Sequence, residues 1–325
     1  MRCSAYRLPP PGIPFRLVFV GQSTFFEACS LADELAPEFA TAFVEYRAGA
    51  DPQAMLTTVG SLHPHAVVVF RPELVPPSLF EHLDALTIGF LTEPIPRVRR
   101  GTHRDLERRL EDLRAIDPSN FDRLVSFDPL IAETAAEVAP VWRSLPLPVS
   151  DRYFAAPRPL RPQLPPLFVG RSTPHREAYL TPLKHRYDLL HIAHGADAAM
   201  LERLLAEHDV GVNLHNEPYS SFENRVCLHL AAGHLVLTEP LTPTHGLEPG
   251  IDYLEVASPE HLATIVAAVR ETPEAFEDVR SRGRMKAELY RASAVYPRLL
   301  HDAALDVDAF GSRKDRAYAT PATSS

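Results

Sequence analysis

The sequence predicts an α/β protein made of two doubly wound, parallel-sheet domains, and three observations support this prediction. The chain has 325 residues, which is more than one hydrophobic core usually serves. Short apolar runs rich in β-branched residues alternate with longer amphipathic stretches, as is typical of βαβ units. One strand exit also occurs twice, as FVGQST at 19–24 and as FVGRST at 168–173.

The first half of the chain contains four apolar runs that predict buried strands. These runs are RLVFV (16–20), TAFVEY (41–46), AVVVF (66–70) and TIGFL (87–91). Helical patterns accompany them near 24–36, 52–61, 78–84 and 103–115. Between 140 and 166 prolines punctuate the chain, which predicts a semi-extended linker with the domain boundary inside it.

The same alternation restarts after the linker. Strands are expected at 167–170, 187–192, 210–215, 234–238 and 252–256. Helices are expected near 174–183, 197–208, 221–232 and 258–271, with further helices over 273–305 and a polar, disordered tail from about 311. We therefore expect a first domain over 1–155, a second over 156–291, and a C-terminal helix plus tail over 292–325.

The composition indicates a soluble cytoplasmic protein. Lys and Arg total 33 against 42 Asp and Glu, which argues against a nucleic-acid binder. Three cysteines, an odd number without a CxxC pair, point to a reducing compartment. We expect no signal peptide, and no apolar run reaches the roughly 18 residues that a transmembrane helix needs.

Seven arginines lie between Arg97 and Arg114, with acidic residues interleaved among them. This pattern is typical of a solvated helix face. The alternative is a patch that contacts an anionic acceptor or, weakly, a membrane surface.

The doubled hexapeptide predicts two equivalent βα turns, although a chance match of a common strand exit is the alternative. Ligands of such sheets bind beyond the carboxyl ends of the strands, so we expect the two turns to face a common cleft. In the second turn, Gly170 permits a tight bend, Thr173 can cap the next helix, and Arg171 can bind phosphate oxygens.

The first turn has Gln22 where the second has Arg171. Because an amide carries no charge, only the second domain is expected to hold an anionic group. Gly21, Gln22 and Ser23 are then assigned to the acceptor side. Alternatively, Arg171 is an ordinary surface arginine.

The densest group of polar residues follows the strand expected at 210–215. Asn213, His215, Asn216 and Glu217 lie at or beyond its end. The sequence SSFE at 220–223 fits a capping box, so Glu223 is either a helix cap or a functional carboxylate. His229 and His234 are expected to be core histidines or, less simply, ligand-binding ones.

Several common motifs are missing from the sequence. It has no GxSxG elbow, no Walker A lysine and no GxGxxG, so hydrolase, P-loop and ordinary dinucleotide functions find no support. His191 and His194 lack the HExxH pattern, so no metal site is expected.

The stretch from FENR through AAGHLVLTEP to GLEPGIDYLEVASPEHLATIV resembles the C-terminal half of GT-B glycosyltransferases, with the CgeB-like and family 1 or family 4 enzymes of bacteria as the nearest branch. The resemblance covers roughly 165–300 well. It implies two Rossmann-like domains, an acceptor on the first, a nucleotide-sugar donor on the second, and a C-terminal helix that crosses back to the first domain. It implies neither a metal nor a cofactor besides the nucleotide-sugar.

The resemblance also assigns the site. The donor-binding residues would be Gly170, Arg171, Ser172, Thr173, His194, Asn213, His215, Asn216, Phe222, Asn224 and Arg225. The catalytic candidates are Glu223, Glu217 and Glu93, the last of which follows a strand in the first domain. The chain departs from the family where two glutamates are usual, since Leu228 and Ser220 occupy those positions.

The resulting expectation is a metal-independent, retaining glycosyltransferase that moves a sugar from a nucleotide-sugar to a small molecule or glycan. Two alternatives remain. One is a catalytically silent nucleotide- or sugar-binding protein of the same fold, which Leu228 favours. The other is a nucleotide-sugar epimerase on the same architecture.

Overall fold

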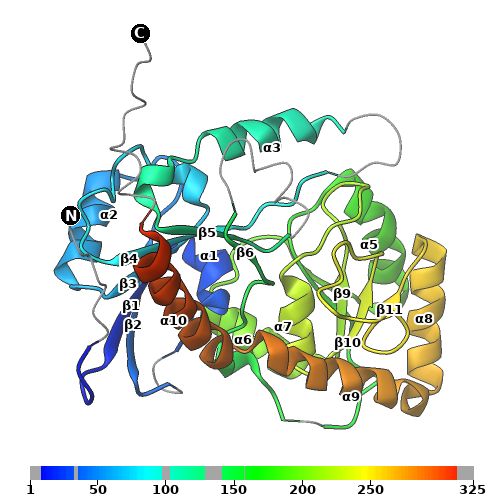
Figure 1. Ribbon diagram of the computed structural model, residues 1–325. Helices are drawn as coiled ribbons and strands as arrows, with labels where there is room; N and C mark the ends of the chain where they lie inside the picture. The colour runs from blue at the N-terminus through cyan, green and yellow to red at the C-terminus, as the bar shows by residue number, and fades with distance from the viewer. Residues whose placement is uncertain (1–8, 33–35, 97–102, 129–140, 157, 313–325) are drawn as a thin grey trace. The chain divides into compact units, whose positions relative to one another are not determined.

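The computed structural model describes residues 9–32, 36–96, 103–128, 141–156 and 158–312 (Figure 1). The chain divides into two compact units. Unit 1 consists of Met1–Pro94, Arg104–Pro146 and Ala292–Ser325, and unit 2 consists of Ile95–His103 and Leu147–Arg291. Each unit has its own parallel sheet, so the predicted fold class is confirmed.

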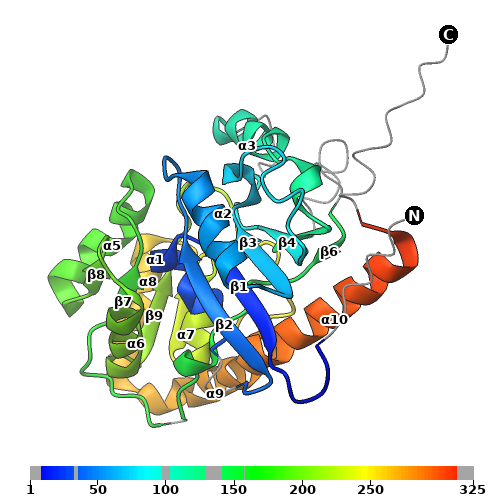
Figure 2. The same ribbon diagram turned by 90° about the vertical axis from the view of Figure 1, so that its left-hand side faces the viewer.

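Unit 1 contains a six-stranded parallel sheet in the order β2-β1-β3-β4-β5-β6 (Figure 2). The strands are β1 (Phe15–Gly21), β2 (Phe39–Glu45), β3 (Ala66–Phe70), β4 (Leu86–Leu91), β5 (Arg123–Ser126) and β6 (Arg143–Ser144). The central strands β3 and β4 are buried along their whole length, as expected when helices cover both faces of a parallel sheet.

Unit 1 differs from the sequence prediction in several places. The helix expected near 24–36 is reduced to the short segments Ser23–Phe26 and Glu27–Cys29, and the short strand β6 was not predicted. No helix forms near 78–84, where Ser78 has a left-handed φ of 60° and turns follow two prolines. Strand β5 was not predicted because its buried Arg123 and Ser126 hide the apolar pattern. Arg123 is accommodated there by Asp306, which accepts a hydrogen bond from its Nε at 2.5 Å.

The helical elements of unit 1 are short except for the last one. They are α1 (Ser23–Phe26), η1 (Glu27–Cys29), α2 (Pro52–Ser61), η3 (Pro72–Leu74), α3 (Asp105–Arg114), η4 (Pro118–Asn120) and α10 (Ala292–Phe310). Helix α10 packs through Tyr296, whose ring meets Phe19 edge-on with centroids 4.9 Å apart. The hydroxyl of Tyr296 donates to the carbonyl of Cys29 at 2.5 Å, and Leu299 and Leu300 are buried beside it.

Unit 2 contains a five-stranded parallel sheet in the order β11-β10-β9-β7-β8. The strands are β7 (Leu167–Val169), β8 (Leu190–Ile192), β9 (Val210–Asn213), β10 (Leu235–Thr238) and β11 (Leu254–Glu255). The helical elements are η5 (Asp151–Tyr153), α5 (Pro174–Tyr187), α6 (Ala198–Glu207), α7 (Arg225–Ala231), α8 (Pro259–Glu271), η6 (Pro273–Phe276), α9 (Glu277–Lys286) and η7 (Ala287–Tyr290).

Alternating residues of β9 explain how helices cover both faces of the unit 2 sheet. Val210 and Val212 join a core that includes residues of α5 and α8, which lie side by side (Figure 1). Gly211 faces the opposite way, where a Cβ would lie 2.3 Å from the ring of His229 on α7. Glycine is therefore required at this position because the histidine ring packs directly on the strand.

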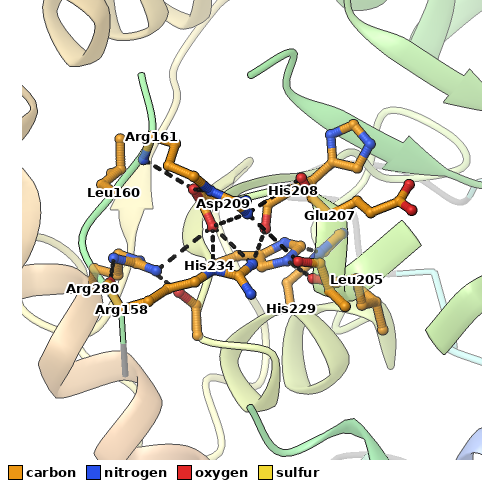
Figure 3. A network of polar contacts seen from close by, with 12 residues as sticks. Arg158, Leu160, Arg161, Leu205, Glu207, His208, Asp209, His229, His234 and Arg280 are labelled. Atoms are coloured by element: carbon orange, nitrogen blue, oxygen red, sulfur yellow. Dashed lines mark hydrogen bonds and ion pairs between the residues drawn. The ribbon is translucent and has the colours of Figure 1, made fainter. Parts of the chain in front are cut away.

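A buried polar network fastens the start of unit 2 to the amino end of β9 (Figure 3). Asp209 is fully buried, and its carboxylate accepts hydrogen bonds from Arg158 and Arg161, each Nε at 2.8 Å. Below it, Nδ1 of His229 lies 2.9 Å from Nδ1 of His234, whose Nε2 is 2.7 Å from the carbonyl of Leu205. Both histidines are core residues, one of the two roles proposed for them.

The two sheets have the same strand order once each is numbered from its own first strand. In both, the first strand lies between the second and the third, so the order reverses between β1 and β3 in unit 1 and between β7 and β9 in unit 2. Open α/β sheets bind ligands at such a reversal, beyond the carboxyl ends of the strands. The doubled hexapeptide marks this place in each unit.

Candidate functional site

The reversal point of unit 2 is lined by the turn after β7 and the segment after β9. Gly170 begins the first turn with φ +155°, and a Cβ there would lie 2.6 Å from Nη1 of Arg225. Both the backbone conformation and this close approach require glycine. Thr173 caps α5, since its side chain accepts a hydrogen bond from the backbone N–H of Arg176 at 3.3 Å.

Arg171 lies exposed at this turn and is held in one direction. Its Nε donates to Oδ1 of Asn216 at 2.8 Å, while the hydroxyl of Thr173 donates to the Asn216 carbonyl at 3.0 Å. The structure thus brings together three residues that the sequence assigned to one site. Ser172 points elsewhere, donating to Glu177 at 2.6 Å.

Arg225, at the start of α7, makes hydrogen bonds to both the end of β7 and the segment after β9. Its Nη1 donates to the carbonyl of Val169 at 3.0 Å, its Nη2 to the carbonyl of Leu214 at 3.0 Å, and its Nε to Oδ1 of Asn213 at 2.9 Å. The other side of Asn213 donates to Thr238 at 2.8 Å. Arg225 is therefore a fixed cation, with only 13% of its side chain exposed.

A second buried arginine, Arg176, was not among the predicted site residues. It is 3% exposed and donates to the carbonyls of Leu214, His215 and Arg171 at 3.1, 3.2 and 3.1 Å. Burial and the nearby charge of Arg225 lower its pKa to about 9. One sequence signal was available, because an arginine in the first turn of a helix opposes the macrodipole and needs another reason to be there.

Both guanidinium groups lie over the ring of Phe168, the first residue of the hexapeptide. The distances to the ring centroid are 5.4 Å for Arg176 and 5.0 Å for Arg225. Cations within about 6 Å of an aromatic face are attracted to it. The buried aromatic ring therefore helps to keep two positive charges close together.

Glu223 lies between these two arginines and does not form the capping box that its sequence suggested. Helix α7 begins at Arg225, its N-cap is Asn224, and that residue makes no side-chain cap bond. The two carboxylate oxygens of Glu223 instead approach Arg176 and Arg225, each at 3.3 Å. Burial alone raises the pKa of Glu223, but the charges of Arg225 and Arg176 outweigh it and hold the pKa below its ordinary value.

His215 is a buried structural residue at this edge. Its Nε2 lies 2.8 Å from the carbonyl of Pro240 and its Nδ1 lies 3.0 Å from the hydroxyl of Ser221, so Nε2 carries the proton and Nδ1 accepts. Burial lowers its pKa, which agrees with a neutral ring. The ring therefore holds the loops after β9 and β10 in place.

Glu239, directly after β10, is a further carboxylate of this site, and the sequence prediction missed it. It accepts a hydrogen bond from the backbone N–H of His215 at 2.7 Å and lies 2.8 Å from Nε2 of His175. Burial would raise the pKa of Glu239, but its bonds to His175 and His215 lower it. The signal was its place in TEP at the end of a predicted strand.

The remaining donor residues and the catalytic candidate Glu217 are less closely involved. Phe222 is buried and packs edge-on against His245 with centroids 4.6 Å apart. His194 is exposed, and Glu217 is half-buried. The arginine cluster thus rests on Arg171, Arg176 and Arg225, with Glu223 between the buried pair.

The equivalent turn of unit 1 has different chemistry. Gly21 ends β1, and the backbone N–H of Ser23 donates to Oε2 of Glu45 at 2.7 Å. Glu45 is the last residue of β2, directly opposite Gly21 in the strand register. A carboxylate of the chain itself therefore occupies the position beside Gln22.

Glu93, after β4, lies between Arg71 and Arg109 of unit 1. Its Oε1 is 3.5 Å from Arg71, and its Oε2 pairs with Arg109, which is buried. Arg71 has a left-handed φ of 63° and also pairs with Glu73, whose pKa is raised by burial. Arg109 is thus a structural part of this network rather than a member of a solvated face.

The other described members of the arginine patch are exposed, and two of them are paired on α3. Arg114 lies 2.8 Å from Glu107 and Arg108 lies 3.8 Å from Asp105. The members Arg97, Arg99 and Arg100 lie outside the described residues, as do Cys3 and the tail from 313. Among the helices that the structure describes, none is both long and apolar enough to cross a membrane.

Comparison with known proteins identifies the fold. No protein-family model and no curated protein sequence matches the chain. Among solved structures, HepE (Alr3699) of Anabaena with UDP and glucose is 11% identical and superposes with a TM-score of 0.52, covering 90% of this chain and 100% of that one. AviGT4, a glycosyltransferase involved in avilamycin A biosynthesis, is 12% identical with a TM-score of 0.54, covering 91% and 99%.

A glycosyltransferase of Rickettsia africae gives a similar result, with 11% identity, a TM-score of 0.51, and coverage of 92% and 100%. The chain has the GT-B fold. The site described above lies at the carboxyl ends of the strands of the second sheet. It is built from Gly170, Arg171, Arg176, Arg225 and Glu223.

Proposed function

We propose that this protein is a glycosyltransferase that transfers a sugar from a nucleotide-sugar donor bound to unit 2. The observation that carries the proposal is the arginine cluster at the reversal point of the second sheet. Arg171 is exposed and oriented by Asn216, while beneath the same turn Arg176 is buried and Arg225 has only 13% of its side chain exposed. Sites of this kind suit a diphosphate, because guanidinium groups bind phosphate oxygens bidentately.

The proposed role of the cluster is to stabilise the leaving group. As the bond to the sugar breaks, negative charge builds on the departing nucleoside diphosphate, and fixed positive groups lower the free energy of that state most. Arg171 and the N–H groups of the turn would contact the phosphates, while Arg176 and Arg225 would contribute their charge from below. We therefore propose transfer that needs no metal, with these side chains supplying the positive charge.

The nature of the donor is proposed from the proteins of the same fold. HepE was solved with UDP, with UDP and glucose, and with UDP-glucose. UDP and UDP-sugars are accordingly the first probes for this chain. From the resemblance of roughly 165–300 to the C-terminal half of GT-B glycosyltransferases, we propose retention of configuration, with unit 1 holding the acceptor through residues near Gln22 and Ser23.

One observation favours a second candidate function, a nucleotide-binding protein without turnover. Leu228 is a buried residue of α7, with 8% exposure. It lies at the position where the resemblance expects a ribose-binding glutamate. Glu239 or Glu223 would have to provide the missing carboxylate. Binding without turnover is the result that would select this alternative.

A thermal-shift screen followed by a turnover assay tests the proposal. A ligand that binds only the folded protein raises its melting temperature, so UDP, GDP, ADP and TDP should separate into binders and non-binders. Nucleotide-sugars with the preferred base should then release the free diphosphate, faster with a suitable acceptor. If none of these diphosphates stabilises the protein, the proposed donor site is wrong.

A further inference from the structure

The arginine pair of unit 2 already holds an anion, namely the carboxylate of Glu223. Each oxygen approaches a different guanidinium, Arg176 on one side and Arg225 on the other, at 3.3 Å. Glu223 is 24% exposed, more than either arginine at 3% and 13%. It is therefore the member of the trio that water and ligands can reach most easily.

The two arginines cannot easily move away from this place. Arg176 donates to three backbone carbonyls, and Arg225 donates to two carbonyls and to Asn213. These bonds join the turn after β7 to the segment after β9. Moving either guanidinium would strand buried carbonyl groups, each of which costs free energy when it loses its partner.

The contacts of Glu223 are the loosest that these arginines make. The other bonds of Arg176 measure 3.1 to 3.2 Å and those of Arg225 measure 2.9 to 3.0 Å, against 3.3 Å to the carboxylate in both cases. Charged groups that bond well lie at about 2.7–2.9 Å. The site thus combines two fixed cations with one carboxylate that they hold at longer range, and that also accepts a hydrogen bond from the backbone N–H of Asn216.

We propose that Glu223 is an exchangeable counter-ion of the donor site, which occupies the arginine pair in the free protein and yields it to the diphosphate. This inference rests on the proposed function. The carboxylate keeps two buried cations neutralised while the site is empty, and unpaired buried charges would otherwise destabilise the fold. It also competes with the incoming phosphates, so nucleoside diphosphates bind more weakly than the arginine count alone would allow.

Isothermal titration of the wild-type protein and Glu223→Gln with UDP tests the proposal. The amide keeps the size of the side chain but removes the competing charge, so we expect UDP to bind about tenfold more tightly. Uridine, which has no phosphate, should bind both proteins equally. The gain should shrink as salt rises, because salt screens the extra positive charge. Inorganic pyrophosphate should follow UDP.

A matched control and a second variant keep the test sharp. Glu202→Gln makes the same charge change on an exposed part of α6 in the same unit and should leave UDP binding unchanged. Glu223→Asp keeps the charge but shortens the side chain, so it cannot span both arginines. The UDP affinities should rise in the order wild type, Asp, Gln, and the Asp variant decides the matter if the Gln variant does not fold.

Failure of the inference differs from failure of the proposed function. If UDP binds the wild-type protein and Glu223→Gln binds it no more tightly, or turnover falls with UDP affinity unchanged, then Glu223 is not a competing counter-ion. If neither UDP nor any other nucleoside diphosphate binds either protein, the proposed function fails and the inference fails with it.

Discussion

The two units of this chain share a strand order and a hexapeptide, yet their equivalent edges differ in charge. Unit 2 has Arg171 at the turn, oriented by Asn216, and the strand beside it ends at Ile192 and is followed by Ala193, both uncharged. Unit 1 has Gln22, and the strand beside it ends at Glu45, whose carboxylate accepts a hydrogen bond from the backbone N–H of Ser23. The fold therefore provides the same place in both units, and the side chains around it give that place opposite charge.

The first residue of the hexapeptide shows the same divergence. Phe19 packs against Phe70 and against Tyr296 of α10, so it serves the core of unit 1. Phe168 instead lies under the guanidinium groups of Arg176 and Arg225. A repeated sequence therefore predicted equivalent backbone positions but not equivalent side-chain roles.

Each unit also places a glutamate between two arginines, Glu223 in unit 2 and Glu93 in unit 1. Removing one arginine from each unit should give the largest difference in stability between the two units. Arg225→Met removes the donor to the Val169 carbonyl and to Asn213, and leaves Glu223 with Arg176 alone, so we expect a loss of about 3–5 kcal/mol in stability. Arg71→Met should cost about 1–2 kcal/mol, because 30% of that side chain is exposed and water can replace it.

Urea unfolding, with hydrogen exchange to report on each unit, measures both variants. The Arg225 variant should lose protection in β7 and β9 first. Equal losses in the two variants would mean that the buried carbonyl contacts of unit 2 contribute nothing beyond an ordinary ion pair.

Acid should affect unit 2 before unit 1 because of its buried histidine pair. Burial lowers the pKa of His234 to about 4 and that of His229 well below its ordinary value of 6.5. The unfolded chain therefore binds more protons than the folded one between pH 6.5 and about 4, and stability falls as the pH drops through this window. For His234 alone the loss reaches about 3 kcal/mol at pH 4.

Hydrogen exchange at pH 7, 6 and 5 checks this expectation by reporting on α7 and β9. In unit 1, His65 also has a lowered pKa, but it is only half-buried and accepts a bond from the N–H of Arg16. Unit 1 should lose less protection over the same range. Equal losses in both units would contradict the assignment of the acid sensitivity to the histidine pair.

The fold was predictable because its signals are local. Strands such as AVVVF and TIGFL are apolar on both faces, which is typical of the buried strands of a parallel sheet. Strand β5 escaped prediction because Arg123 is neutralised by Asp306, which lies 183 residues further along the chain. A partner that distant in sequence cannot be recognised from a local pattern.

The site was predictable from two signals, a position near a strand end and the resemblance to a known family. Arg171, Asn213 and Asn216 lie near the ends of predicted strands, Arg225 was assigned by the resemblance, and the structure brings these residues together. Arg176 and Glu239 were missed because their roles depend on carbonyl groups and histidines that other segments bring to them. The capping-box interpretation of Glu223 was wrong because the helix starts later, at Arg225.

Arg171→Gln converts the second turn into the sequence of the first and sharpens the comparison. Folding should be almost unchanged, because the side chain is exposed and an amide can also donate the hydrogen bond to Asn216. The variant loses one charge-assisted contact to phosphate, about 1.5–3 kcal/mol, or roughly ten- to a hundredfold in affinity for UDP. Uridine binding should not change, and Gln22→Ala is the control.

The smallest expected effect comes from moving the charge to the other turn. A double variant, Gln22→Arg with Arg171→Gln, keeps the composition and net charge of the wild-type protein. Its new arginine would lie beside Glu45, which already holds the N–H of Ser23, and would form an exposed ion pair worth less than about 1 kcal/mol. UDP affinity should therefore stay as low as in Arg171→Gln alone.

Among its described residues, unit 1 has no pair beneath this turn comparable to Arg176 and Arg225. A guanidinium at the tip of the turn is therefore not sufficient. Recovery of UDP binding in the double variant, measured by titration, would show that the tip residue alone defines the site and that the buried pair is dispensable.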